Sequence, residues 1–109
     1  MNTWDLAQAK FTNFLIRYQP MLHLVGVTPQ EIQEMTWDTA APHVISALPV
    51  RGLCNHENSE FLFAAAEAQS DDERVLRLRL VYGGMPADMQ KMLWRYVDFF
   101  FRVVTNEPL

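Results

Sequence analysis

The chain has 109 residues, a net charge of −4 and a hydrophobic fraction of one half, which excludes a mainly disordered chain and fits one domain over residues 1–109. No stretch reaches the roughly 18 consecutive apolar residues of a membrane helix, and the N-terminus has no basic segment followed by an apolar run. The single cysteine excludes an internal disulfide, so we expect a cytoplasmic protein without a membrane association.

The first predicted element is a helix from Trp4 to Tyr18, with Asn2 or Thr3 as its N-cap. Its apolar residues recur at steps of three and four, which defines one core-facing side. Pro20 is expected to interrupt this helix, because proline has no backbone N–H to donate. One further turn then leads to Gly26, a residue type that commonly ends helices.

Two short helices are predicted within residues 28–58. The first, at about 29–38, follows a capping box formed by Thr28 and Glu31. The second, at about 42–48, ends at Pro49, and a polar loop then runs from residue 51 to 58. Two short helices joined by a tight turn are common in transcription regulators, so residues 28–58 are expected to be a helix-turn-helix-like part. On its second helix, His43 and Ser46 are candidate DNA contacts.

Three more helices are predicted in the rest of the chain. One covers about 59–69, and a second begins after the capping signal of residues 70–73. The leucine–arginine alternation of residues 75–82 is also typical of a strand. A helix is favoured there, because the cap is strong and no partner strand is apparent. The fold class expected is therefore all-α, a bundle of five to six helices.

The last predicted helix, residues 86–104, has an unusually wide apolar arc. Trp94, Val97 and Phe101 lie on a flank outside its main apolar face. Either this helix is central in the fold, or the flank packs on another chain. We expect the second arrangement, which makes these three residues a partner interface and the protein a homodimer through this helix.

Charge is distributed unevenly along the chain. Residues 1–73 contain 3 basic and 10 acidic residues, whereas residues 74–109 contain 6 basic and 3 acidic ones. Because phosphate neutralisation supplies much of the affinity for DNA, the candidate phosphate contacts are Arg51, Arg74, Arg77 and Arg79. The alternative is that these arginines neutralise the acidic part of the chain, within the fold or across a dimer.

No catalytic motif is present, and one cluster alone resembles a reactive site. Cys54 and His56 are too few for a four-ligand zinc site. A Cys–His nucleophile would also need a third group that orients the imidazole and a cleft for the substrate. We therefore expect a protein that is not an enzyme and that has no cofactor or metal.

Residues 26–54 resemble the FlhD family, the small helical subunit of the flagellar master regulator. The similar positions are Gly26, Val27, Met35, Thr39, Val44, Ala47, Leu53 and Cys54. This resemblance implies a non-enzymatic subunit that assembles with a second protein, which supplies much of the DNA contact.

A second resemblance is to phage-repressor-type helix-turn-helix domains. Residues 28–35 are similar to their second helix, residues 43–52 to the recognition helix and its exit, and residues 61–68 to the following core helix. The function expected from both resemblances is a transcription regulator or co-regulator. The alternative is a small acidic inhibitor or adaptor of phage, plasmid or immunity type, which binds and blocks a protein target.

Overall fold

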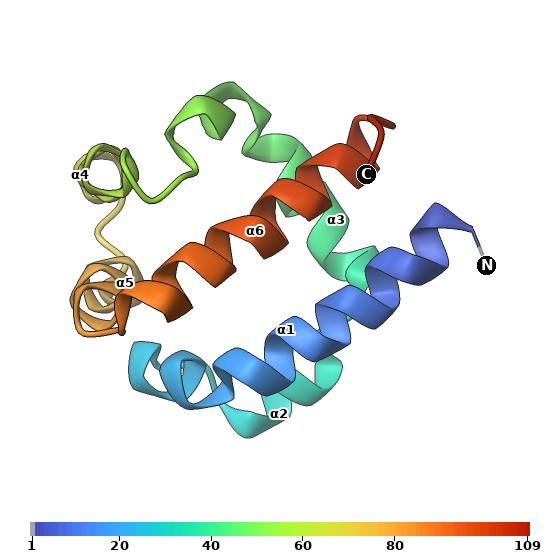
Figure 1. Ribbon diagram of the computed structural model, residues 1–109. Coiled ribbons are helices and arrows are strands. Elements are labelled where there is room, and N and C mark those ends of the chain that lie inside the picture. The colour runs from blue at the N-terminus through green and yellow to red at the C-terminus, as the bar shows by residue number, and fades with distance from the viewer. Residues whose placement is uncertain (1) are drawn as a thin grey trace.

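The computed structural model describes residues 2–109 (Figure 1). Within this range six α-helices and one 3-10 helix occur and no residue lies in a strand, which confirms the all-α class. The elements are α1 (Thr3–Val25), α2 (Pro29–Glu34), α3 (Trp37–Ser46), the 3-10 helix η1 (Leu48–Leu53), α4 (Ser59–Gln69), α5 (Glu73–Gly83) and α6 (Ala87–Val104). None of these described helices is both long and apolar enough to cross a bilayer.

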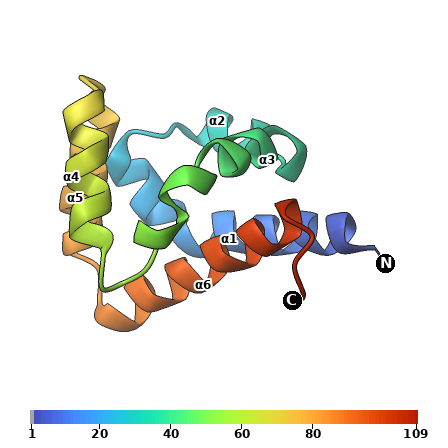
Figure 2. The same cartoon turned by 90° about the horizontal axis from the view of Figure 1, so that it is seen from above.

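Helices α1 and α6 lie side by side and run in opposite directions (Figure 1). The α2–α3 segment forms a second layer, in which α3 contacts both α1 and α6 (Figure 2). The α4–α5 pair stands at one end of the molecule, where α5 packs on α1 (Figure 2). This arrangement places α6 in the centre of the fold.

Helix α1 continues through Pro20, where the sequence predicted an interruption. The proline removes one backbone hydrogen bond to the carbonyl of Ile16. Both residues lie on the exposed side of the helix, so the missing hydrogen bond faces solvent rather than the core. The helix ends at Gly26, whose φ of 107° lies in the left-handed region, and Val27 N donates to Leu22 O at 2.9 Å. Gly26 is therefore the expected terminator.

The capping box of Thr28 and Glu31 is confirmed at the start of α2. Helix α3 begins at Trp37, five residues before the predicted start, because Thr36 and Thr39 form a second capping box. Pro42 lies inside α3 rather than at its start. The polar loop expected from residue 51 onward is still helical up to Leu53, within η1.

Residues 75–82 are helical, as the stronger of the two sequence interpretations predicted. The N-cap is Asp72, whose Oδ1 accepts from Arg74 N at 2.9 Å, while Ser70 Oγ accepts from Asp72 N. In a helix the alternating pattern spreads the leucines around the axis. Leu76, Leu78 and Leu80 are consequently exposed, and only Tyr82 of this series is buried.

The core consists of two adjoining clusters. One surrounds Trp37 and joins α1, α3 and α6 through Phe11 and Phe100. The other lies at the α4–α5 end and contains Tyr82 and Trp94. Both clusters include residues of α6, which therefore packs against α1 and α3 in one cluster and against the α4–α5 pair in the other.

Candidate functional site

The four arginines expected to contact phosphate are all paired with carboxylates of this chain. Arg74 donates two hydrogen bonds of 2.8 Å to Glu31, and Arg77 donates one of 2.9 Å to Glu73. Arg79 contacts Glu60 at 2.9 Å and Glu67 at 3.1 Å. Arg51 contacts Glu107 and Asp98. A phosphate would have to displace these carboxylates. The arginines thus neutralise acidic residues within the fold, the alternative interpretation of their sequence positions.

The Arg74–Glu31 pair has a measurable pH signature. Hydrogen bonds from Arg74, and then from the backbone N–H of Thr28, lower the pKa of the Glu31 carboxyl from 4.5 to about 2. A carboxyl with a lowered pKa stabilises the fold above its unfolded-state pKa, and this contribution is lost as the pH falls through the folded-state value.

We therefore expect Glu31→Gln to lower the melting temperature at pH 7, with a difference from wild type that shrinks as the pH falls from 4.5 to about 2. Thermal unfolding followed by circular dichroism between pH 2 and pH 7 measures this. Glu57→Gln is the control, because it removes one negative charge at a residue without an ion pair in the described part of the chain. A pH-independent effect of Glu31→Gln would contradict the expectation.

His43 and Ser46 lie on the exposed side of α3. Ser46 Oγ donates to the carbonyl of Pro42 at 3.0 Å, so its only proton is already used within the helix. Helix α3 contains no lysine or arginine. The exposed side of this helix therefore offers little charge to a phosphate backbone.

The expected partner interface on α6 is not an exposed flank. Trp94 and Phe101 retain only 9% and 3% of their accessible surface, and Val97 is half-buried. Trp94 packs on Phe63 and Tyr82, so α4 and α5 cover it within the same chain. The prediction that Trp94 and Phe101 face a partner is therefore wrong. The wide apolar arc of α6 results from its central position, the other arrangement that the sequence allowed.

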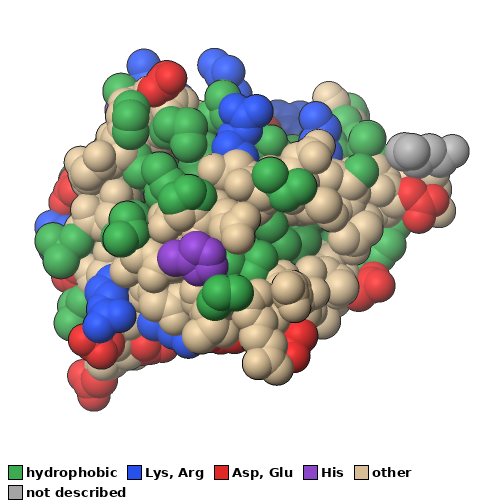
Figure 3. All heavy atoms as spheres, turned by 90° about the horizontal axis from the view of Figure 1, so that it is seen from below, with side chains coloured by type: hydrophobic (Ala, Val, Ile, Leu, Met, Phe, Trp, Pro, Cys, Tyr) green, Lys and Arg blue, Asp and Glu red, His purple; other side chains and the backbone are tan. Residues whose placement is uncertain are grey.

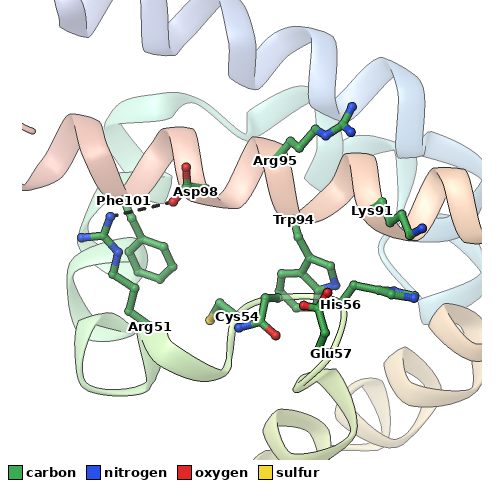
Figure 4. A pocket seen from close by; sticks show the side chains of 10 residues that line it. Arg51, Cys54, His56, Glu57, Lys91, Trp94, Arg95, Asp98 and Phe101 are labelled. Carbon is green, nitrogen blue, oxygen red and sulfur yellow. Dashed lines mark ion pairs between the residues drawn. The ribbon is translucent and has the colours of Figure 1, made fainter. Parts of the chain in front are cut away.

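The structure gathers several of the singled-out residues around one hollow of about 500 Å³ between α6 and the segment from η1 to α4 (Figure 4). Cys54, His56 and Glu57 reach it from that segment, and Lys91, Trp94 and Arg95 from α6 (Figure 4). Burial raises the pKa of the Cys54 thiol, and its Sγ donates to Val50 O at 3.5 Å. A thiol held in its neutral form is a poor nucleophile.

His56 is oriented by the core rather than by Cys54. Trp94 Nε1 donates to Tyr82 Oη at 2.7 Å, and the same hydroxyl is hydrogen-bonded to His56 Nδ1 at 3.2 Å. Among residues 2–109, no hydrogen bond joins Cys54 to His56 and no group of three or more potential ligands could hold a metal.

Sequence reasoning placed Lys91 and Arg95 on the polar stripe of the last helix but did not join them with the cations of the first helix, on the α1–α6 side. The side chains of Lys10, Arg17, Lys91 and Arg95 are exposed, and none has a carboxylate partner in the part of the chain that the structure describes. Arg17 instead lies 2.8 Å from Met92 Sδ. The i, i+4 spacing of Lys91 and Arg95 was a visible signal, because such residues share one side of a helix.

A second overlooked feature is an apolar groove between α1 and α5. It has a volume of about 460 Å³ and is lined by Met21, Leu24, Arg77, Leu80, Val81, Gly84 and Met85. Leu24 is 67% exposed and Leu80 76% exposed. Figure 3 shows hydrophobic side chains in several groups on the side of the molecule where α5 and the C-terminal end of α1 lie. Leu24 escaped notice because the first helix was expected to end before it.

Among the large hydrophobic residues of the described chain, Leu80 has the highest exposed fraction, and Leu24 equals Ile16 at 67%. Comparison of the chain with protein-family models, with curated proteins and with solved structures found no match.

Proposed function

We propose that this chain is a non-enzymatic cytoplasmic protein that works by binding another protein, as a small acidic adaptor or inhibitor. The observation that carries the proposal is the α1–α5 groove with its two highly exposed leucines. Single exposed leucines are common on protein surfaces, whereas a contiguous apolar groove marks an interaction site. The pairing of Arg51, Arg74 and Arg79 supports it, since it leaves little free charge for DNA there.

The occupant we propose for the groove is an amphipathic helix of the partner. A groove with an apolar floor between two helices receives the apolar side of a third helix. Met21 and Met85 give the floor an adaptable shape, because methionine has an unbranched and flexible side chain. Arg77 also lines the groove but is already paired with Glu73, so the partner helix is expected to bind mainly through its apolar side.

We expect Leu80→Asp to weaken partner binding about 30-fold or more, because a buried interface anchor contributes about 2 kcal/mol. Phe61→Asp is the matched control, since Phe61 is 66% exposed on α4, outside the groove. Both variants and the wild type carry a photo-cross-linker at position 24 and are expressed in the native host. Cross-linked proteins are then identified by mass spectrometry.

The proposal requires one protein that is cross-linked by the wild type and by Phe61→Asp but not by Leu80→Asp. In purified form, this protein should bind the wild type and Phe61→Asp more tightly than Leu80→Asp. A cross-linked set that is unchanged by Leu80→Asp would refute it. Light scattering after size exclusion identifies the case in which the captured protein is a second copy of this chain.

The second candidate is a transcription co-regulator that reaches DNA within a complex. The unpaired cations Lys10, Arg17, Lys91 and Arg95 favour it, together with the resemblance to the FlhD family. Fluorescence anisotropy with a 20-base-pair duplex tests this, with the chain alone and with its captured partner. Binding that weakens steeply between 50 and 200 mM salt, and that Arg95→Glu reduces, would favour the co-regulator over the adaptor.

A further inference from the structure

An apolar cavity of about 420 Å³ lies between α1, α3 and α6, apart from the α1–α5 groove. Its walls include Phe11, Leu15, Val44, Val97 and Phe100, all of them buried or half-buried. Of its lining residues only Thr39 and His43 are exposed, so these two mark its mouth.

The chemistry of the lining is uniform except at this mouth. No lysine, arginine, aspartate or glutamate lines the cavity. Thr39 Oγ1 already donates to Thr36 O at 2.9 Å and accepts from Thr36 N at 3.1 Å, within the capping box of α3. The imidazole of His43 has no hydrogen-bond partner within the described chain. One free polar group therefore stands at the opening of an apolar chamber.

The size of the chamber is that of a ligand site rather than of a packing defect. Protein interiors are packed as densely as organic crystals and rarely contain voids larger than a water molecule. Small-molecule sites have volumes of about 300–1,000 Å³, mostly apolar walls and a few polar groups that fix the orientation of the ligand. The space beside His43 matches small-molecule sites in both its volume and its mostly apolar lining.

We propose that this cavity binds a medium-chain aliphatic carboxylate, with its hydrocarbon chain inside and its carboxylate hydrogen-bonded to His43. The walls are aliphatic as well as aromatic, and Met35 is able to adapt to a flexible chain. An ammonium head group would meet no carboxylate at the mouth. A carboxylate, in contrast, accepts a hydrogen bond from the His43 ring, and no acidic residue of the lining repels it.

Decanoate and decanol are the probes, because they share one chain and differ in the charge of the head group. Isothermal titration calorimetry measures both affinities, and the melting temperature with and without ligand gives an independent readout. Val44→Phe fills the cavity, whereas Ile45→Phe introduces the same ring at the next residue, which does not line it. His43→Ala removes the polar group.

We expect the wild type and Ile45→Phe to bind decanoate and to be stabilised by it, and Val44→Phe to bind it at least tenfold more weakly. His43→Ala should weaken decanoate about tenfold and decanol about twofold or less. Ala40→Leu, which adds an aliphatic side chain to the same wall, should repeat the result of Val44→Phe if that variant fails to fold.

Absence of decanoate binding up to millimolar concentration would overturn the proposal. Unchanged affinity in both Val44→Phe and Ala40→Leu would overturn it as well, because the ligand would then lie elsewhere. Equal losses of decanoate and decanol in His43→Ala would overturn the assignment of the carboxylate. Leu80→Asp, the variant of the α1–α5 groove, should bind decanoate with the affinity of the wild type. Ligand binding in the cavity and partner binding in the groove are therefore tested independently.

Discussion

Trp37→Ala should lower the free energy of unfolding by about 3–5 kcal/mol, as truncation of a fully buried tryptophan does. Trp37 is 0% exposed, and its ring stacks on Phe100 at 5.1 Å between centroids. This contact holds α3 on α6. Because a domain of this size is stable by only about 5–15 kcal/mol in total, urea denaturation followed by circular dichroism should show a strongly reduced midpoint.

Trp4→Ala is the control for this loss, since Trp4 is 43% exposed and meets the edge of Trp37 at 5.4 Å. We expect it to cost about 1 kcal/mol, the typical value of one aromatic pair. Trp37 Nε1 has no hydrogen-bond partner, so Trp37→Phe should retain much of the packing without losing a hydrogen bond. Equal costs for the alanine variants of the two tryptophans would show that α3 is not anchored by Trp37.

Tyr82→Phe should cost about 1–3 kcal/mol, although it removes a single oxygen atom. The phenol oxygen accepts the buried hydrogen bond of 2.7 Å from Trp94 Nε1. Without it, the indole N–H remains buried and unpaired, and the cost is the desolvation of that donor. Chemical denaturation of the single variant measures the change.

A double-mutant cycle with Trp94→Phe separates this cost from a general effect on packing. In the Trp94→Phe background no indole N–H is left unpaired, so Tyr82→Phe should cost about 0.5–3 kcal/mol less than in the wild type. His56→Ala tests the other hydrogen bond of the Tyr82 hydroxyl and should be milder, because His56 is only half-buried. Strictly additive costs of Tyr82→Phe and Trp94→Phe would refute the coupling.

The local features of this fold could be derived from sequence because each depends on residues three or four positions apart. The capping box of Thr28 and Glu31 and the helical terminator Gly26 are both of this kind. Proline was the exception. Pro20 and Pro42 were treated as breaks or starts, yet each lies inside a helix. At Pro20 the lost hydrogen bond lies on an exposed side of the helix, away from the core.

The candidate surfaces depend on distances across the fold that sequence spacing does not contain. The Arg74–Glu31 pair joins residues 43 positions apart, so the neutralisation of Arg74 follows from the packing of α5 on α1 and the position of α2 beside them. The burial of Trp94 and Phe101 likewise follows from the central position of α6, which a wide apolar arc permits but does not require. Conversely, the groove appears only when Leu24 and Leu80 are brought together.

The leucines and arginines of α5 also determine which side chains this segment would present if the helix opened. Residues 75–82 keep the alternation of a β-strand while they are held as a helix, so opening of α5 would present one side of leucines and one of arginines. Such a segment can pair edge to edge with other copies. Arg77 and Arg79 then act as gatekeepers, because stacked copies would bring their like charges together without the carboxylates that neutralise them in the native fold. The same two side chains thus stabilise the native helix and penalise its misassembly.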